Sequence, residues 1–189
     1  MRRIQMLLET VKKILEHALK VAEKINKKDL DKIIELLTAS KSIFVLGSGR
    51  SKLVGEEFAM RLAQLELNVH VIGDSTTITP REGDLIIVIS SSGDTSSIIT
   101  EARRLKKKGV NIIGITANPR SELSKLSDII IDVGPWRDYQ REIKEEREDN
   151  ITLLGTLYED TSLLILDGII SELMRKVGKT EGDLAEAHY

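Results

Sequence analysis

The sequence predicts an α/β fold: a three-layer, doubly wound, five-stranded parallel sheet of the flavodoxin-like or Rossmann-like kind, with an N-terminal helical extension. Two observations lead to this fold class. Five short apolar runs rich in β-branched residues alternate with segments in which apolar residues recur at helical spacing. Strands that alternate with helices of this size form a parallel sheet covered on both faces, and right-handed crossovers make it doubly wound.

Two helical segments precede the first strand and form the extension. A long first helix is predicted by apolar residues at helical spacing, namely Ile4, Leu7, Leu8, Val11, Leu15, Ala18, Ala22 and Ile25. A second helix, up to about Ser40, is predicted from Leu30, Ile33, Ile34 and Leu37. These helices pack on the sheet, or the long first helix packs against a second subunit. The sequence favours neither alternative.

The predicted strands span residues 42–46, 69–72, 85–89, 111–115 and 128–133. The helix after the first strand has an inner face formed by Leu53, Val54, Phe58, Leu62 and Leu65. The helix after the third strand ends in three lysines before Gly109, with cations at the negative helix end and glycine just beyond. A short helix at 121–126 precedes the fifth strand.

The last third of the sequence differs from the rest in composition, because a highly charged segment is followed by a strongly apolar one. Residues 134–150 crowd together charges of both signs, which predicts a solvated loop or exposed helix. The following helix is apolar nearly all round and is expected to be buried on most sides, with a subunit interface as one reason. Its apolar residues are Leu163, Leu164, Ile165, Leu166, Ile169, Ile170, Leu173, Met174 and Val177. We expect one domain over 1–189: helices in 1–40, the sheet core in 41–134, and the charged loop, buried helix and tail in 135–189.

Composition narrows the function. The net charge is −2 and aromatic residues make up 3% of the 189 residues, so no nucleic-acid partner is expected. The chain has no cysteine, which excludes disulfides and thiolate metal sites, and its three histidines lack metal-ligand spacing. No apolar run is long enough to span a bilayer and the N-terminus lacks a signal-peptide core, so we expect a cytoplasmic protein with no membrane partner.

A polar turn follows the third strand and precedes a helix. It is called here the serine turn, Ser90-Ser91-Ser92-Gly93-Asp94-Thr95. A helix start has unpaired backbone N–H groups and the positive end of the macrodipole, so hydroxyls and a glycine beside it suit an anion, phosphate above all. A helix N-cap is the alternative explanation, but a cap requires one such residue rather than five polar ones.

A second turn, the glycine turn, follows the first strand with the sequence Gly47-Ser48-Gly49-Arg50-Ser51. Ligands of doubly wound sheets bind at the carboxyl ends of the strands, so both turns are placed to converge on one ligand. A dinucleotide fingerprint needs glycine where this chain has Lys52, and only Asp74 favours that alternative. Two hydroxyl-rich turns suited to one phosphate monoester remain.

These two turns resemble the signatures of the sugar isomerase (SIS) domain family, a Gly-x-Gly-x-Ser turn and a Ser-x-Ser-Gly-x-Thr turn. Within that family the chain is most similar to the 6-phospho-3-hexuloisomerases. The resemblance covers essentially the whole chain, and it implies the flavodoxin-like form of the fold. Further matches are Phe58-Ala59-Met60-Arg61-Leu62, the loop 73–80, Gly155-Thr156-Leu157-Tyr158-Glu159, and His188.

The resemblance implies roles for both turns. Phosphate is expected to bind the side chains of Ser90, Ser92 and Thr95 and the backbone N–H groups of Ser91, Gly93 and Asp94. The glycine turn contributes Ser48 and Ser51, and Gly49, like Gly93, lets the backbone approach closely. We expect the Asp94 carboxylate to point outward or to pair with a cation such as Arg50, because it repels phosphate. Arg50 itself is interpreted as a partner of substrate or of a carboxylate.

The implied reaction interconverts D-arabino-hex-3-ulose 6-phosphate and fructose 6-phosphate through a 2,3-enediol(ate). It requires a base and stabilisation of the enediolate oxygens, but no redox cofactor and no metal. Glu159 matches the family's general base, since a partly dry pocket would bring its pKa closer to working pH. His188 matches a terminal histidine that shuttles protons near neutral pH, from the same or a neighbouring subunit.

Two other hypotheses stay open at this point. One is a non-catalytic phosphosugar-binding sensor, because fold alone does not determine function. The other is an isomerase of a different sugar phosphate. The family also implies a homo-oligomer, commonly a tetramer, and a metabolic link to 3-hexulose-6-phosphate synthase in the ribulose monophosphate pathway.

Overall fold

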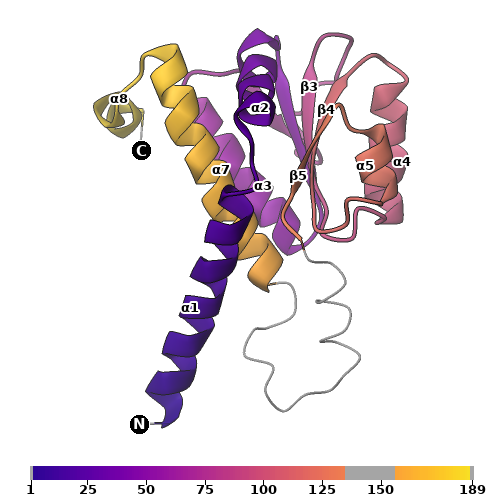
Figure 1. Ribbon diagram of the computed structural model, residues 1–189. Helices are drawn as coiled ribbons and strands as arrows, with labels where there is room; N and C mark the ends of the chain where they lie inside the picture. The colour runs from indigo at the N-terminus through magenta and orange to yellow at the C-terminus, as the bar shows by residue number, and fades with distance from the viewer. Residues whose placement is uncertain (1, 135–155, 188–189) are drawn as a thin grey trace.

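The computed structural model describes residues 2–134 and 156–187. Its centre is a parallel sheet with the strand order β2-β1-β3-β4-β5 (Figure 1). The strands are β1 (Ile43–Gly47), β2 (Val69–Val71), β3 (Leu85–Ile89), β4 (Asn111–Thr116) and β5 (Ile129–Asp132). This order is the flavodoxin-like one, so the predicted fold class is confirmed and the Rossmann-like alternative is excluded.

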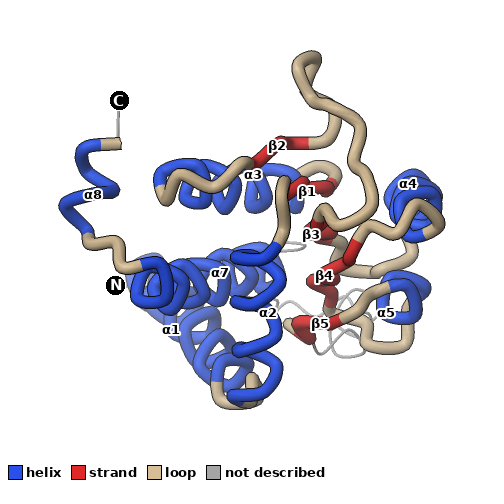
Figure 2. Tube along the Cα trace, turned by 90° about the horizontal axis from the view of Figure 1, so that it is seen from above, coloured by secondary structure: helices blue, strands red, loops and turns tan. Residues whose placement is uncertain are grey.

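Helices cover both faces of the sheet, as Figure 2 shows from above. Successive strand residues point to opposite faces: Val45 and Ile87 belong to one apolar cluster, and Phe44 and Ile86 to the other. The first cluster is closed by α2 (Lys27–Ala39), α3 (Arg50–Gln64) and α7 (Thr156–Val177), the second by α4 (Ser96–Lys106) and α5 (Glu122–Leu126). The structure therefore has the three predicted layers.

The register of the central strands positions the site. Gly47, the last residue of β1, pairs with Ile89, the last of β3, and Ile89 in turn pairs with Ile115 of β4. Ile89 and Ile115 are almost completely buried. The carboxyl ends of these three strands are therefore level, and the chain segments that follow them begin side by side.

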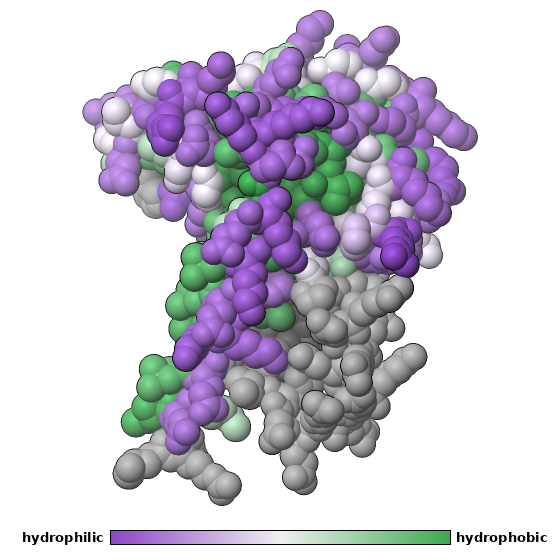
Figure 3. Space-filling model, viewed as in Figure 1, coloured by the Kyte–Doolittle hydropathy of each residue, from purple (hydrophilic) through white to green (hydrophobic). Residues whose placement is uncertain are grey.

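The long first helix is confirmed as α1 (Arg2–Ala22), but most of it projects beyond the sheet (Figure 1). Only its last turns pack on the body, through the buried Ala18 and Val21, while His17 Nε2 lies 2.9 Å from the carbonyl oxygen of Val133. The apolar residues along its outer side are exposed and form a stripe visible in Figure 3. This α1 stripe consists of Ile4, Leu7, Leu8, Val11, Leu15 and Leu19.

Two expectations about packing need correction, and a third cannot be compared with the structure. Leu53 was placed on the inner face of its helix, yet 63% of it is exposed, because the inward positions of α3 are taken by Val54, Phe58 and Leu62. The long helix α7 buries one side only, leaving Leu164 partly exposed. The charged run at 137–149, for which a solvated loop or exposed helix was expected, lies outside the described residues.

None of the helices in the described part of the chain combines the length and apolar character that crossing a membrane requires.

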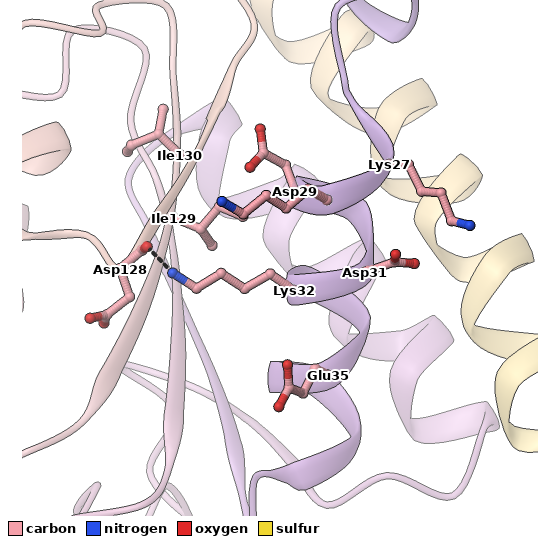
Figure 4. Close-up of a pocket in the computed structure, with 9 residues that line it drawn as sticks. Lys27, Asp29, Asp31, Lys32, Glu35, Asp128, Ile129 and Ile130 are labelled. Atoms are coloured by element: carbon pink, nitrogen blue, oxygen red, sulfur yellow. Dashed lines mark hydrogen bonds between the residues drawn. The ribbon is translucent and has the colours of Figure 1, made fainter.

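The helix α2 lies against the open edge of β5, and a groove lined by both elements is drawn in Figure 4. Lys32 Nζ donates a 2.6 Å hydrogen bond to the carbonyl oxygen of Asp128. The Asp128 carboxylate is bonded to Lys106 Nζ at 2.6 Å and to Ile112 N at 2.8 Å. These hydrogen bonds, together with a mixture of charges along the groove, indicate that its residues hold α2 against β5. The helix thereby covers the exposed edge of the sheet.

Candidate active site

The structure brings the two turns together at the carboxyl ends of β1 and β3. They line one cavity of about 200 Å³, whose walls are Ser48, Ser51, Ile89, Ser90, Ser91, Ser92, Thr95 and Ile98. Six of these eight residues carry hydroxyl groups. The other two are isoleucines, Ile89 at the end of β3 and Ile98 in the first turn of α4. The cavity is therefore a small polar hollow on an apolar support.

Two helices begin at this cavity without a side-chain cap. The N-cap residues of α3 and α4 are Gly49 and Thr95, and neither makes a side-chain cap hydrogen bond. The helices α2, α5 and α8 (Glu181–Glu186), by contrast, are capped by the side chains of Asn26, Ser121 and Thr180. Uncapped first-turn N–H groups and two positive helix ends are features that suit an anion.

The hydroxyl groups of the serine turn converge but bond each other only loosely. Thr95 Oγ1 lies 3.4 Å from Ser90 Oγ and 3.5 Å from Ser92 Oγ. Distances this long for O–H···O contacts leave most of the donor capacity unused. Three hydroxyl donors are thus available beside the N-terminus of α4.

The backbone donors differ from those expected. Gly93 N donates to the Ser90 carbonyl at 3.0 Å and Asp94 N donates to Ser92 Oγ at 3.2 Å, so both N–H groups are engaged within the turn. Among the described residues, Ser91 N has no partner. The expectation that all three N–H groups face phosphate is therefore wrong for Gly93 and Asp94, because the turn closes on itself.

Asp94 points outward, which confirms the first of the two alternatives expected for it, and it does not pair with Arg50. Asp94 Oδ1 accepts a 2.9 Å hydrogen bond from the backbone N–H of Glu122 at the start of α5, so the carboxylate points away from the cavity. Arg50 instead reaches α7: its Nη1 donates to Thr156 Oγ1 at 3.0 Å, and its Nη2 lies 3.5 Å from Asp160 Oδ1. Arg50 therefore has a carboxylate partner, Asp160, as one of its two predicted roles requires. Its contacts link the N-terminal end of α3 to the N-terminal end of α7.

Glu159 lies in the first turn of α7 and is only 9% exposed. Its Oε2 atom is buried and has no hydrogen-bond partner within the described chain. Burial raises the pKa of Glu159 above its usual value, while the positive charge of Arg50 lowers it in part. A buried carboxylate with a free oxygen and a raised pKa suits proton abstraction.

Three residues of the site were missed by reasoning from the sequence. Tyr158, next to Glu159, donates a 2.8 Å hydrogen bond from its hydroxyl to the Ile115 carbonyl. Thr116, the last residue of β4, and Asn118, two residues later, donate hydrogen bonds to carbonyl groups of the serine turn. Tyr158 stands in the motif that resembles the family, but the sequence offers no signal for the other two because their contacts are made across 25 or more residues.

His188 lies outside the described residues. The nearest helix to it in sequence, α8, lies beyond the Val177 end of α7, away from the end that carries Glu159 (Figure 1). Between Glu159 and Val177 the helix rises by about 27 Å, at roughly 1.5 Å per residue.

Asp74 was the one feature that favoured a dinucleotide ligand. Its carboxylate lies 3.9 Å from the ammonium group of Lys52, which also pairs with Glu56.

Comparison with known proteins identifies the family. The model of the SIS domain matches residues 36–139. The 3-hexulose-6-phosphate isomerase of Bacillus subtilis is 35% identical over 90% of this chain and 90% of its own length. That of Methanocaldococcus jannaschii is 32% identical over 86% of this chain and 83% of its own length.

The fold agrees with a solved structure. The crystal structure of a Methanococcus jannaschii protein, for which a 3-hexulose-6-phosphate isomerase function was inferred, matches with a TM-score of 0.81 and 29% identity. The match covers 96% of this chain and 98% of that one. With the turns, the strand order and these matches together, the chain belongs to the SIS domain family.

Proposed function

We propose that this protein is a sugar-phosphate isomerase that interconverts D-arabino-hex-3-ulose 6-phosphate and fructose 6-phosphate. The observation that carries the proposal is a cavity with two uncapped helix N-termini, set at the same end of the sheet as the Glu159 carboxylate. That carboxylate is buried and has an oxygen that bonds to no other residue in the described part of the chain. Relatives named 3-hexulose-6-phosphate isomerase support an isomerase acting on a phosphosugar. An enzyme of the 3-hexulose-6-phosphate synthase type would supply or consume the 3-ulose.

The phosphate is proposed to bind in the serine-lined cavity. The hydroxyls of Ser90, Ser92 and Thr95 and the N–H of Ser91 donate to its oxygens, and Ser48 and Ser51 complete the shell from the glycine turn. The two helix ends supply positive potential without a charged side chain at the cavity wall. Binding energy gained at the phosphate then holds the carbon chain in position for the reaction.

Glu159 is proposed as the base. Starting from fructose 6-phosphate, Oε2 removes the proton on C3, and the electron pair forms the C2–C3 double bond of an enediolate. Return of the proton to C2 and transfer of the O3–H proton to O2 leave the carbonyl group at C3. Arg50, held by Thr156 and Asp160, places a positive charge near the developing enediolate oxygens.

His188 is proposed to carry the proton between O2 and O3, from a neighbouring subunit. The helix α8 lies at the end of α7 opposite to Glu159, so a second copy of the chain is the more direct source of a histidine at this site. The α1 stripe offers the surface for such assembly. It presents six large apolar side chains on one side of a 21-residue helix, and a helix with one apolar side needs a partner to cover it.

Proton exchange in D2O tests the proposal. Fructose 6-phosphate is incubated with wild type, Glu159→Gln and the control Glu172→Gln. Glu172 lies near the other end of α7, and its side chain is 41% exposed. We expect deuterium at C3 and a growing 3-ulose signal by NMR for wild type and the control, and neither for Glu159→Gln. A wild type that binds the sugar phosphate but exchanges no proton contradicts the enzyme proposal and leaves a phosphosugar sensor.

A further inference from the structure

Three consecutive carbonyl groups of the serine turn are hydrogen-bonded to one neighbouring segment, which runs from the end of β4 through the connection that follows it into α5. Ser91 O accepts from Ala117 N at 3.0 Å and from Thr116 Oγ1 at 3.1 Å. Ser92 O accepts from Asn118 Nδ2 at 3.2 Å. Gly93 O accepts from Leu123 N at 3.0 Å. The outer side of the turn is therefore fully bonded.

Packing at Gly93 shows that the turn is pressed closely against this connection. Gly93 has a φ of +65°, and a Cβ atom placed there would lie 2.1 Å from Ser121 Oγ and 2.9 Å from Thr116 Oγ1. Only glycine fits such an approach with this backbone conformation. The Asp94 carboxylate adds to the bracing, because Oδ1 accepts from Glu122 N at 2.9 Å and Oδ2 from Asn118 Nδ2 at 3.4 Å.

The bonded carbonyls determine where the N–H groups point. In a planar trans peptide the C=O of one residue and the N–H of the next point in opposite directions. Holding Ser91 O outward therefore turns the N–H of Ser92 toward the cavity side. Holding Gly93 O outward turns Asp94 N–H onto Ser92 Oγ, 3.2 Å away. That hydroxyl, already an acceptor, keeps its proton for an oxygen of the ligand.

We propose that Thr116 and Asn118 are positioning residues, which hold the serine turn in its phosphate-binding conformation without touching the substrate. This inference rests on the proposed function, since it concerns the same phosphate site. A preformed turn does not have to be ordered when the ligand binds, so its loss weakens binding. The alternative is that Asn118 only stabilises its own loop, through the hydrogen bond from Arg120 N to Asn118 Oδ1 at 3.2 Å.

The test compares Asn118→Ala and Thr116→Val with the matched control Asn68→Ala. Asn68 also donates its side-chain amide, to Ser42 Oγ at 2.8 Å, but near the amino ends of β1 and β2. Calorimetry measures the Kd of inorganic phosphate and of fructose 6-phosphate, and steady-state kinetics give KM and kcat. Circular dichroism and thermal unfolding show which variants are folded.

We expect Asn118→Ala to raise both Kd values and KM together by about tenfold, the upper end of the usual effect of losing one hydrogen bond. Thr116→Val should act in the same direction but less, because Ala117 N still holds Ser91 O. The value of kcat should change by less than about twofold, and Asn68→Ala should leave every binding constant unchanged.

Unchanged Kd values in folded Asn118→Ala and Thr116→Val overturn the inference, and so does a loss for fructose 6-phosphate without a loss for inorganic phosphate. The two proposals fail separately. A wild type that binds phosphate but does not isomerise the sugar contradicts the proposed function, while the phosphate Kd values still decide the role of Thr116 and Asn118. A wild type that does not bind phosphate contradicts both.

Discussion

The hydroxyl group of Tyr158 donates a 2.8 Å hydrogen bond to the carbonyl oxygen of Ile115, deep at the carboxyl end of the sheet. The same carbonyl accepts the N–H of Ser90, the first residue of the serine turn, at 3.0 Å. Tyr158 precedes Glu159 in the chain. One carbonyl oxygen thus connects the beginning of the serine turn to the helix turn that carries the proposed base.

Tyr158→Phe should distinguish the contribution of this hydrogen bond from that of the packed ring, because it removes the hydroxyl group and keeps the ring. We expect the free energy of unfolding to fall by about 1 kcal/mol, the net value of one hydrogen bond. We also expect kcat to fall by about tenfold, since a small displacement of Glu159 weakens catalysis. Urea unfolding and steady-state kinetics measure the two effects. An unchanged kcat in the folded variant would show that Tyr158 contributes only to stability.

The pH dependence of activity should report the environment of Glu159. Its pKa is raised by burial above the ordinary 4.5, and a base acts only when ionised, so the acid limb of kcat/KM should lie above pH 4.5. Arg50 lowers this pKa, so Arg50→Met should move the limb to higher pH.

The control for this profile is Lys52→Met, which removes a cation that pairs with Glu56 and Asp74 instead. Its acid limb should coincide with that of wild type. A limb that stays in place in Arg50→Met would contradict the electrostatic contact between Arg50 and Glu159.

The same pKa has a consequence for stability. A carboxyl group whose pKa is higher in the folded than in the unfolded state favours folding in its protonated form. The protein should therefore lose stability through Glu159 as pH rises from 4.5 through the raised pKa. Glu159→Gln removes this cost, so we expect it to unfold at higher urea concentration than wild type at pH 7 although it is inactive. A lower midpoint would show that the carboxylate is stabilised by a contact.

The α1 stripe should carry the assembly of the protein. Leu8→Glu places a charge in the middle of the stripe, where the native side chain is 61% exposed, and we expect a smaller particle by light scattering after size-exclusion chromatography. Lys20→Gln changes the net charge by the same amount on the other side of the helix and should leave the particle size unchanged. An unchanged mass for Leu8→Glu would exclude the stripe as the interface.

Mixing two inactive variants tests whether the site is shared between subunits. Glu159→Gln and His188→Ala are co-expressed with different tags, and hybrid oligomers are purified through both. If His188 acts in a neighbouring subunit, one site of every heterodimer, or roughly a quarter of the sites in random tetramers, receives both native residues. Activity should return to about that fraction. Hybrids without activity would indicate that both residues act within one chain.

Much of the fold followed from local patterns. The five strands are predictable because apolar, β-branched runs such as Leu85–Ile89 are buried on both faces of a parallel sheet. The long first helix is predictable from its spacing. The exposure of Leu53 could not be predicted from the sequence. Helical periodicity locates the apolar stripe on a helix, but it does not show how much of that stripe neighbouring elements cover.

For the site, the sequence by itself determined which turns carry hydroxyl groups and which helix starts stand beside them, because these depend on neighbours in the chain. Only the tertiary structure decided the rest. It turned Asp94 toward α5, paired Arg50 with Asp160, left Glu159 Oε2 buried with no hydrogen-bond partner in residues 2–134 and 156–187, and placed Asn118 behind the serine turn. These contacts join residues 26 to 110 positions apart, and hydrogen bonds over such separations depend on strand order and register, which no local pattern encodes.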